Sequence, residues 1–216
     1  MGMHHGLIAA ELPWPVLRGH LAVLAGTFAP QGPSTPDNGE LGPNDAGWRL
    51  LAGELDGKAY VLDTSMLSMG GHDALAEVAR RTGALVAACG AETVSGSVSL
   101  FAARGPQILR WYEHCDSAVA CPLQVGTPLP VEQGAPFGGA HGEWLAQFGF
   151  DSDGWLRRGT RTAYQFTPHD LDHPNDAGPL ERQWDAHYRR HALPPPPAPP
   201  LLALLALWQR LWKRGA

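Results

Sequence analysis

The side chains best suited to chemistry lie between residues 169 and 191. Two histidines and two aspartates fall between His169 and His173, and His187 and His191 follow at an i, i+4 spacing. That spacing places both imidazoles on one helix face. Three of the side chains in this region could bind zinc. The alternative is a turn in which the aspartates cap backbone amides and the histidines stay solvated. Zinc motifs are usually tighter in sequence, so these four histidines are only weak metal candidates.

The rest of the chain offers no motif for catalysis. The sequence contains no Gly-rich phosphate loop, dinucleotide fingerprint, nucleophile elbow or metalloprotease helix motif. The three cysteines match neither a redox pair nor a zinc knuckle, and Cys89, which lies in an apolar run, is predicted to be a core residue. We therefore predict no cofactor and no catalytic residue. The alternative function is a small metal-dependent or other hydrolytic enzyme that uses region 169–191.

The distribution of charge favours a protein partner. The net charge is −5, but residues 201–216 hold three basic residues and no acid, which leaves the body with 13 basic and 21 acidic residues. Such an excess of acid argues against nucleic-acid binding. Aromatic side chains inside a charged rim are typical of interface hot spots, and acids favour a basic partner. The predicted partner-binding residues are Tyr112, Glu113, Glu132, Asp151 and Asp153.

One hairpin and one helix are clearly marked. Trp48–Leu55 and Lys58–Asp63 alternate like strands and flank an Asp-Gly pair, which is preferred in tight hairpin turns. Asp73 is expected to cap a helix that ends at Gly83. Its predicted inward positions are Leu75, Val78 and Ala79.

Further elements follow this helix. Residues 94–102 alternate with one apolar face and one Ser-rich face, and a turn leads into a second strand, Ile108–Glu113. A short helix is predicted over Glu143–Phe148 and a last strand within Trp155–Phe166. The order of strands and helices predicts an α+β fold. We expect an antiparallel sheet of about five strands with helices packed on one face.

The chain divides into three parts. Residues 1–192 are expected to form a single globular α+β domain, whose Pro-rich start, Met1–Asp45, is mostly irregular apart from the apolar segment Leu17–Phe28. Residues 193–200 form a polyproline linker, and residues 201–216 an amphipathic helix. Apolar runs are too short for a membrane span, and the first residues do not resemble a secretory signal. These features predict a cytoplasmic protein.

The C-terminal segment has an apolar face and a basic face. It would extend about 20 Å, too short to cross a hydrocarbon core of ~30 Å. Two alternatives remain, a helix lying on an anionic membrane surface and a helix docked in a protein groove. Docking is favoured because an undocked helix would expose a large apolar patch. The contact residues would be Leu204, Leu205, Trp208, Leu211 and Trp212.

Part of the chain resembles a known class of proteins. The resemblance covers residues 48–156 and rests on the Ser-rich alternating strand, the turn at Gly105, Ile108–Glu113, Gly126–Glu132 and a helix that ends at Gln147–Asp151. These features resemble small bacterial immunity-type proteins, which neutralise toxins exchanged between bacteria. The resemblance implies a non-catalytic protein-binding module with a cognate toxin as partner. The acidic body would favour a basic toxin.

Overall fold

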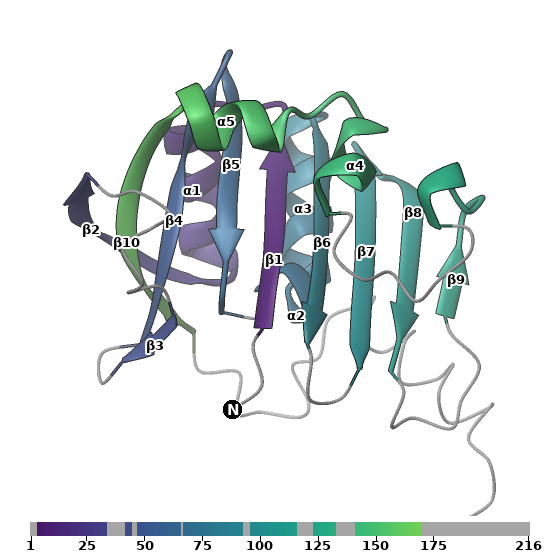
Figure 1. Cartoon of the computed structure of the whole chain (residues 1–216), viewed down its shortest axis with the longest axis horizontal. Helices are drawn as coiled ribbons and strands as arrows, with labels where there is room; N and C mark the ends of the chain where they lie inside the picture. Colours follow the sequence, from purple (N-terminus) through teal and green to yellow (C-terminus); the bar gives the residue numbers. More distant parts are fainter. Residues whose placement is uncertain are drawn as a thin grey trace, which may run out of the picture.

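The structure is a computed structural model. It describes residues 4–33, 42–44, 47–65, 67–92, 96–115, 123–132 and 141–169. Within these residues the chain forms one large antiparallel sheet with helices on both faces (Figure 1).

Ten strands form the sheet, twice the expected number, and all their pairings are antiparallel. Their order across the sheet is β2-β10-β4-β5-β1-β6-β7-β8-β9, and β3 pairs with β4 off this path. The strands are β1 (His4–Ala10), β2 (Gly26–Pro33), β3 (Gly42–Asn44), β4 (Gly47–Leu55), β5 (Lys58–Asp63), β6 (Leu85–Glu92), β7 (Ser97–Arg104), β8 (Gln107–His114), β9 (Leu123–Val125) and β10 (Thr160–Pro168).

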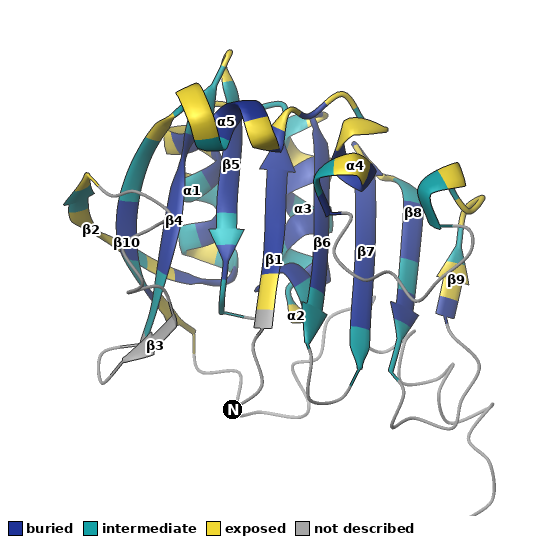
Figure 2. Ribbon diagram, in the orientation of Figure 1, coloured by how far each residue is buried: buried dark blue, intermediate teal, exposed yellow. Residues whose placement is uncertain are grey.

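Helices cover both faces of the sheet, so the α+β class is confirmed but the expectation of helices on one face is wrong. The back face carries α1 (Trp14–Leu24), α2 (Leu67–Gly70) and α3 (His72–Thr82). The front face carries α4 (His141–Ala146) and α5 (Ser152–Arg158). A one-turn 3-10 helix, η2 (Pro130–Glu132), lies beside α4. Two apolar cores result, one on each side of the sheet. The central strands that lie between them are mostly buried (Figure 2).

Both strand faces are apolar, which explains the second helical layer. In β1, Ile8 packs into the back core and its neighbour Leu7 into the front core. In β7, Leu100 faces the front while Phe101 faces the back, and Ser99 on that back face is fully buried. The Ser-rich face of this strand is therefore covered by helices. A sheet covered on both sides loses the polar face on which period-two patterning depends.

The N-terminal segment is regular, which corrects the expectation of an irregular start. Residues His4–Ala10 form β1, the strand between β5 and β6, instead of a loose terminus. The apolar segment predicted at Leu17–Phe28 forms most of α1 and then enters the edge strand β2. Pro15 does not interrupt α1 because it lies in the first turn, where its missing N–H removes no hydrogen bond of the helix.

The predicted hairpin and helix are confirmed. Strands β4 and β5 pair around the Asp56-Gly57 turn, and both turn residues have the positive φ values that such turns require. Helix α3 buries Leu75, Val78 and Ala79 as expected and ends at Gly83, which is left-handed. Asp73, however, lies within the first turn, and Gly71 occupies the cap position.

The last elements agree in part with expectation. Strands β7 and β8 form the second predicted hairpin, and α4 overlaps the short helix predicted at Glu143–Phe148. The strand predicted within Trp155–Phe166 is confirmed as β10, and the start of that segment belongs to α5. Within the described residues no helix is long and apolar enough to cross a membrane. The linker at 193–200 and the C-terminal segment lie outside the described residues.

Candidate functional site

Strand β8 carries polar side chains to both faces of the sheet. Because successive strand residues point to opposite faces, Trp111 and Glu113 face the back, and Arg110 and Tyr112 face the front. Each pair of residues joins a separate polar network.

On the back face, four side chains form what we call the His72 cluster: His72, Ser99, Trp111 and Glu113. The Ser99 hydroxyl lies 2.8 Å from His72 Nε2 and 2.8 Å from Glu113 Oε1. Trp111 Nε1 donates to the same Oε1 at 3.1 Å, and His72 Nδ1 lies 3.3 Å from it. The rings of Phe101 and His72 stack with centroids 5.3 Å apart. The cluster joins the start of α3 to β7 and β8.

Burial controls the charge of this cluster. His72 is 5% exposed, Ser99 is fully buried and Glu113 is 8% exposed. Removal from water raises the pKa of Glu113 to about 8, although hydrogen bonds from Ser99 and Trp111 oppose the shift. The same cause lowers the pKa of His72 to about 4. At neutral pH both side chains are therefore uncharged.

The residue types of the His72 cluster are those of a serine-hydrolase triad, but its arrangement suits a structural role. A nucleophilic hydroxyl must be reachable by a substrate, and Ser99 is fully buried. A triad acid must also be ionised to stabilise an imidazolium, whereas Glu113 is held neutral by burial. Cys89 is equally inaccessible, because burial raises the pKa of its thiol well above the usual value. These groups support internal structure instead of catalysis.

On the front face, Arg110 and Glu132 form a buried ion pair. The Arg110 Nε lies 3.0 Å from Glu132 Oε2 and its Nη2 lies 2.5 Å from the same oxygen. Trp144 Nε1 donates to Oε1 of Glu132 at 3.0 Å, which links β8, η2 and α4. Burial works to raise the pKa of Glu132, but hydrogen bonds from Arg110 and Trp144 outweigh it and hold this pKa below the ordinary value.

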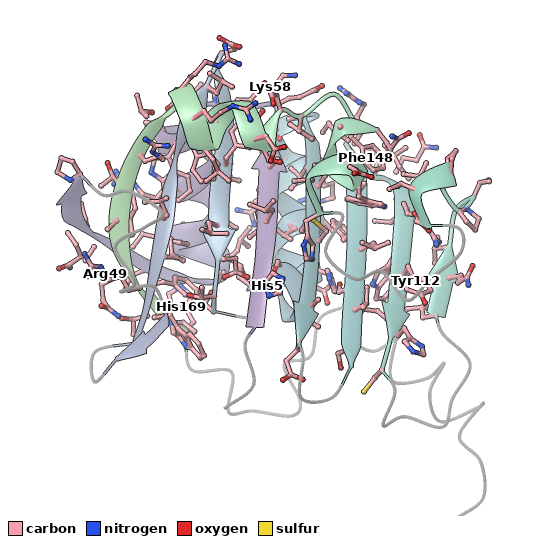
Figure 3. The ribbon with its side chains drawn as sticks, viewed as in Figure 1. His5, Arg49, Lys58, Tyr112, Phe148 and His169 are labelled. Carbon is pink, nitrogen blue, oxygen red and sulfur yellow. The ribbon has the colours of Figure 1, made fainter. Side chains whose placement is uncertain are left out.

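The five predicted partner-binding residues do not form one surface. Glu113 is buried on the back face and Glu132 is paired with Arg110 on the front, so neither forms the exposed charged rim that was expected. Tyr112 is half-buried. The Asp151 amide donates to the Tyr60 hydroxyl of β5, four strand spacings from β8, which corresponds to about 19 Å. Figure 3 shows Tyr112 on β8, well away from Lys58 at the top of β5.

Asp151 and Asp153 remain exposed and belong to what we call the acidic ridge: Glu143, Asp151 and Asp153. A Cβ atom on Gly142 would lie 3.4 Å from Asp153 Oδ1, so this carboxylate lies beside the start of α4. Half-buried Phe148 follows α4, with its ring 4.8 Å from that of Trp144 (Figure 3). Glu143 was missed as a site residue because sequence alone did not show that α4 and α5 adjoin.

The back face carries a groove beside α3. It has a volume of about 570 Å³ and runs between Leu24 of α1 and the β7–β8 turn at Pro106. Glu77 on its wall pairs with Arg80 and Arg81 at 2.5 Å and 2.7 Å. Small and apolar side chains alternate with these paired charges. The remaining lining residues are Asp73, Ala74, Ala76, Gly105 and Ile108.

Of the four histidines considered for metal binding, the structure describes His169. Its Nε2 lies 3.0 Å from the backbone oxygen of Ala22, next to the end of α1. His173, His187 and His191 lie outside the described residues. Over the described ranges no three His, Cys, Asp or Glu side chains are grouped as a metal would require. Residues Leu204, Leu205, Trp208, Leu211 and Trp212 also lie outside them.

Comparisons with known proteins returned no match. No family model, no curated protein and no solved structure matches this chain.

Proposed function

We propose that this protein is a non-catalytic binding module of the immunity type that neutralises a basic bacterial toxin through its acidic ridge. One contrast supports the proposal. The His72 cluster and the Arg110–Glu132 pair are buried, whereas Glu143 on α4, Asp153 on α5 and Asp151 at the start of α5 are exposed, although Asp151 also pairs with Arg158 at 3.1 Å. Exposed acids next to an accessible aromatic side chain, Phe148, suit recognition of a basic protein surface.

Electrostatics indicates what the ridge would contribute to binding. Rim charges act mainly on the association rate, because they steer a partner of opposite charge and repel one of like charge. Asp151 has a second role, since its carboxylate accepts a hydrogen bond from the Gly154 amide at 2.7 Å and caps α5. Substitution of Asp151 would disturb the helix itself. Glu143 and Asp153 are therefore the better residues to change.

The test is a capture experiment followed by charge reversal. The full chain, expressed in its native bacterium, should retain a basic protein whose association slows about tenfold or more when Glu143→Lys and Asp153→Lys are combined. The salt dependence of association should also become weaker. Glu77→Lys, on the opposite face of the sheet, is the matched control and should leave the rate unchanged. Equal association rates for the ridge variant and the wild type would refute this placement.

A further inference from the structure

We propose that the His72 cluster is a proton-dependent latch, which holds α2 and the start of α3 against β7 and β8 while Glu113 carries a proton and loosens when that proton is lost. This inference does not depend on the proposed binding function. It rests on the number of protons that the contacts of the cluster require.

Three contacts in series connect Glu113 to α2. Glu113 Oε1 meets the Ser99 hydroxyl at 2.8 Å, and that hydroxyl meets His72 Nε2 at 2.8 Å. The imidazole also bonds to the backbone of Ser68 in α2. Because Nε2 meets Ser99, the contact with Ser68 is made by Nδ1. Each contact needs one proton. A carboxyl proton, a hydroxyl proton and one imidazole proton together satisfy all three.

Loss of the carboxyl proton leaves two protons for three contacts. Ser99 can then donate to Glu113 and His72 Nε2 to Ser99, but the second ring nitrogen faces the Ser68 carbonyl as acceptor against acceptor. The same nitrogen also lies 3.3 Å from the ionised Glu113. The alternative of donating to Ser68 leaves His72 Nε2 facing Ser99 without a proton. A buried contact that lacks its proton costs free energy, so α2 and the start of α3 are the elements released.

The charges around the cluster are few. Among the described residues, Asp63 of β5 faces it through α2, where it accepts hydrogen bonds at 2.7 Å from both the amide and the hydroxyl of Ser68. Asp73 follows His72 in α3, and Glu92 ends β6 on the same face of the sheet. The polar groups that β7 and β8 place on this face beside Glu113 are Ser97, Ser99 and Trp111, which are uncharged. A cation that would favour ionised Glu113 is not among these neighbours.

The direction of the pH effect follows from the two pKa values. In the unfolded chain Glu113 and His72 lose their protons near pH 4.5 and 6.5, whereas in the folded chain they do so near pH 8 and pH 4. Between pH 4.5 and 6.5 the two shifts cancel. Between pH 6.5 and 8 the folded state holds one more proton than the unfolded state, so stability falls as pH rises. Because one titration is only half complete at each end of this range, the unfolding constant should increase about tenfold in total between pH 6.5 and pH 8.

The test compares variants by chemical denaturation at pH 6.5, 7.2 and 8. Glu113→Gln keeps an uncharged side chain of the same shape, so the rise in the unfolding constant between pH 6.5 and 8 should be absent from this variant. Glu132→Gln is the matched control, because it removes a buried carboxylate that stays ionised throughout. Its effect on the unfolding constant should be the same at all three pH values.

A second measurement keeps the proposal open to refutation if Glu113→Gln fails to fold. Infrared absorption of the wild-type protein should show a protonated carboxyl band at pH 6.5 that loses its intensity by pH 9. Hydrogen exchange in α3, corrected for the intrinsic effect of pH, should accelerate over the same range. A missing carboxyl band, or the same pH dependence of unfolding in wild type and Glu113→Gln, would overturn the latch.

Discussion

Two buried carboxyl groups lie against opposite faces of β8 and differ in charge, since Glu113 is neutral and Glu132 is ionised. Glu113 on the back face meets Ser99, Trp111 and His72, and its pKa rises to about 8. Glu132 on the front face meets the guanidinium of Arg110, and its pKa is lowered. Both are removed from water, so burial alone does not decide ionisation. The difference shows that a cation within hydrogen-bonding distance is what keeps a buried acid charged.

The largest effect is expected when the cation is removed from the front face. Arg110→Met keeps much of the side-chain volume but leaves Glu132 buried without its partner. Breaking a buried pair in this way typically costs about 3–5 kcal/mol of unfolding free energy. Denaturation in guanidinium chloride measures the loss. The double variant Arg110→Met with Glu132→Leu should recover most of it, and a double variant as unstable as the single one would show that lost packing dominates.

Removal of the central hydroxyl of the back-face network should cost less. Ser99→Ala deprives both His72 and Glu113 of their shared hydrogen-bond partner within a fully buried site. Leaving buried polar groups unsatisfied costs about 1–3 kcal/mol. Thermal or chemical unfolding at pH 6 would measure the change. Ser152→Ala, at another buried serine whose hydroxyl makes no hydrogen bond, is the control expected to change stability little.

Acid should affect the front-face pair in the direction opposite to the latch. Because the pKa of Glu132 is lowered by folding, its stabilising contribution is complete above its unfolded value of 4.5 and is lost as pH falls through the lower folded value. Stability of the wild type should therefore decline below pH 4.5, and Arg110→Met should show less of this decline. The same loss of stability below pH 4.5 in both proteins would show that Glu132 does not cause the decline.

The smallest effect is expected at an exposed pair. Glu77 lies between Arg80 and Arg81 on α3, and hydrogen bonds from both arginines lower its pKa to about 2. Solvent and salt screen such pairs, so Glu77→Gln should change the denaturation midpoint by no more than its experimental error. A clear loss of stability would show that the groove beside α3 depends on this ion pair.

Local signals in the sequence predicted the elements whose cause is local. The β4–β5 hairpin follows from its Asp-Gly turn, and α3 follows from its apolar spacing and from Gly83. Cys89 is buried, as its apolar neighbours indicated. These features depend on residues a few positions apart, so the sequence displays them directly.

Features that depend on distant residues could not be predicted in this way. Glu132 looked like an exposed acid because Arg110, 22 positions earlier, is its partner only in the folded chain. Glu113 looked equally exposed because α3, which supplies His72, packs on β8 only in three dimensions. The strand β1 was missed because a strand buried on both faces lacks an alternating pattern.

The position of β1 has a consequence for synthesis on the ribosome. Strand β1 is translated before either of its partners, since β5 is complete only at Asp63 and β6 only at Glu92. One edge of nascent β1 must therefore remain unpaired until Asp63 has left the exit tunnel, and the other edge until Glu92 has done so. Its apolar residues are exposed to chaperones during that interval. The centre of the sheet is thus completed late, when β6 pairs with a strand translated about eighty residues before it.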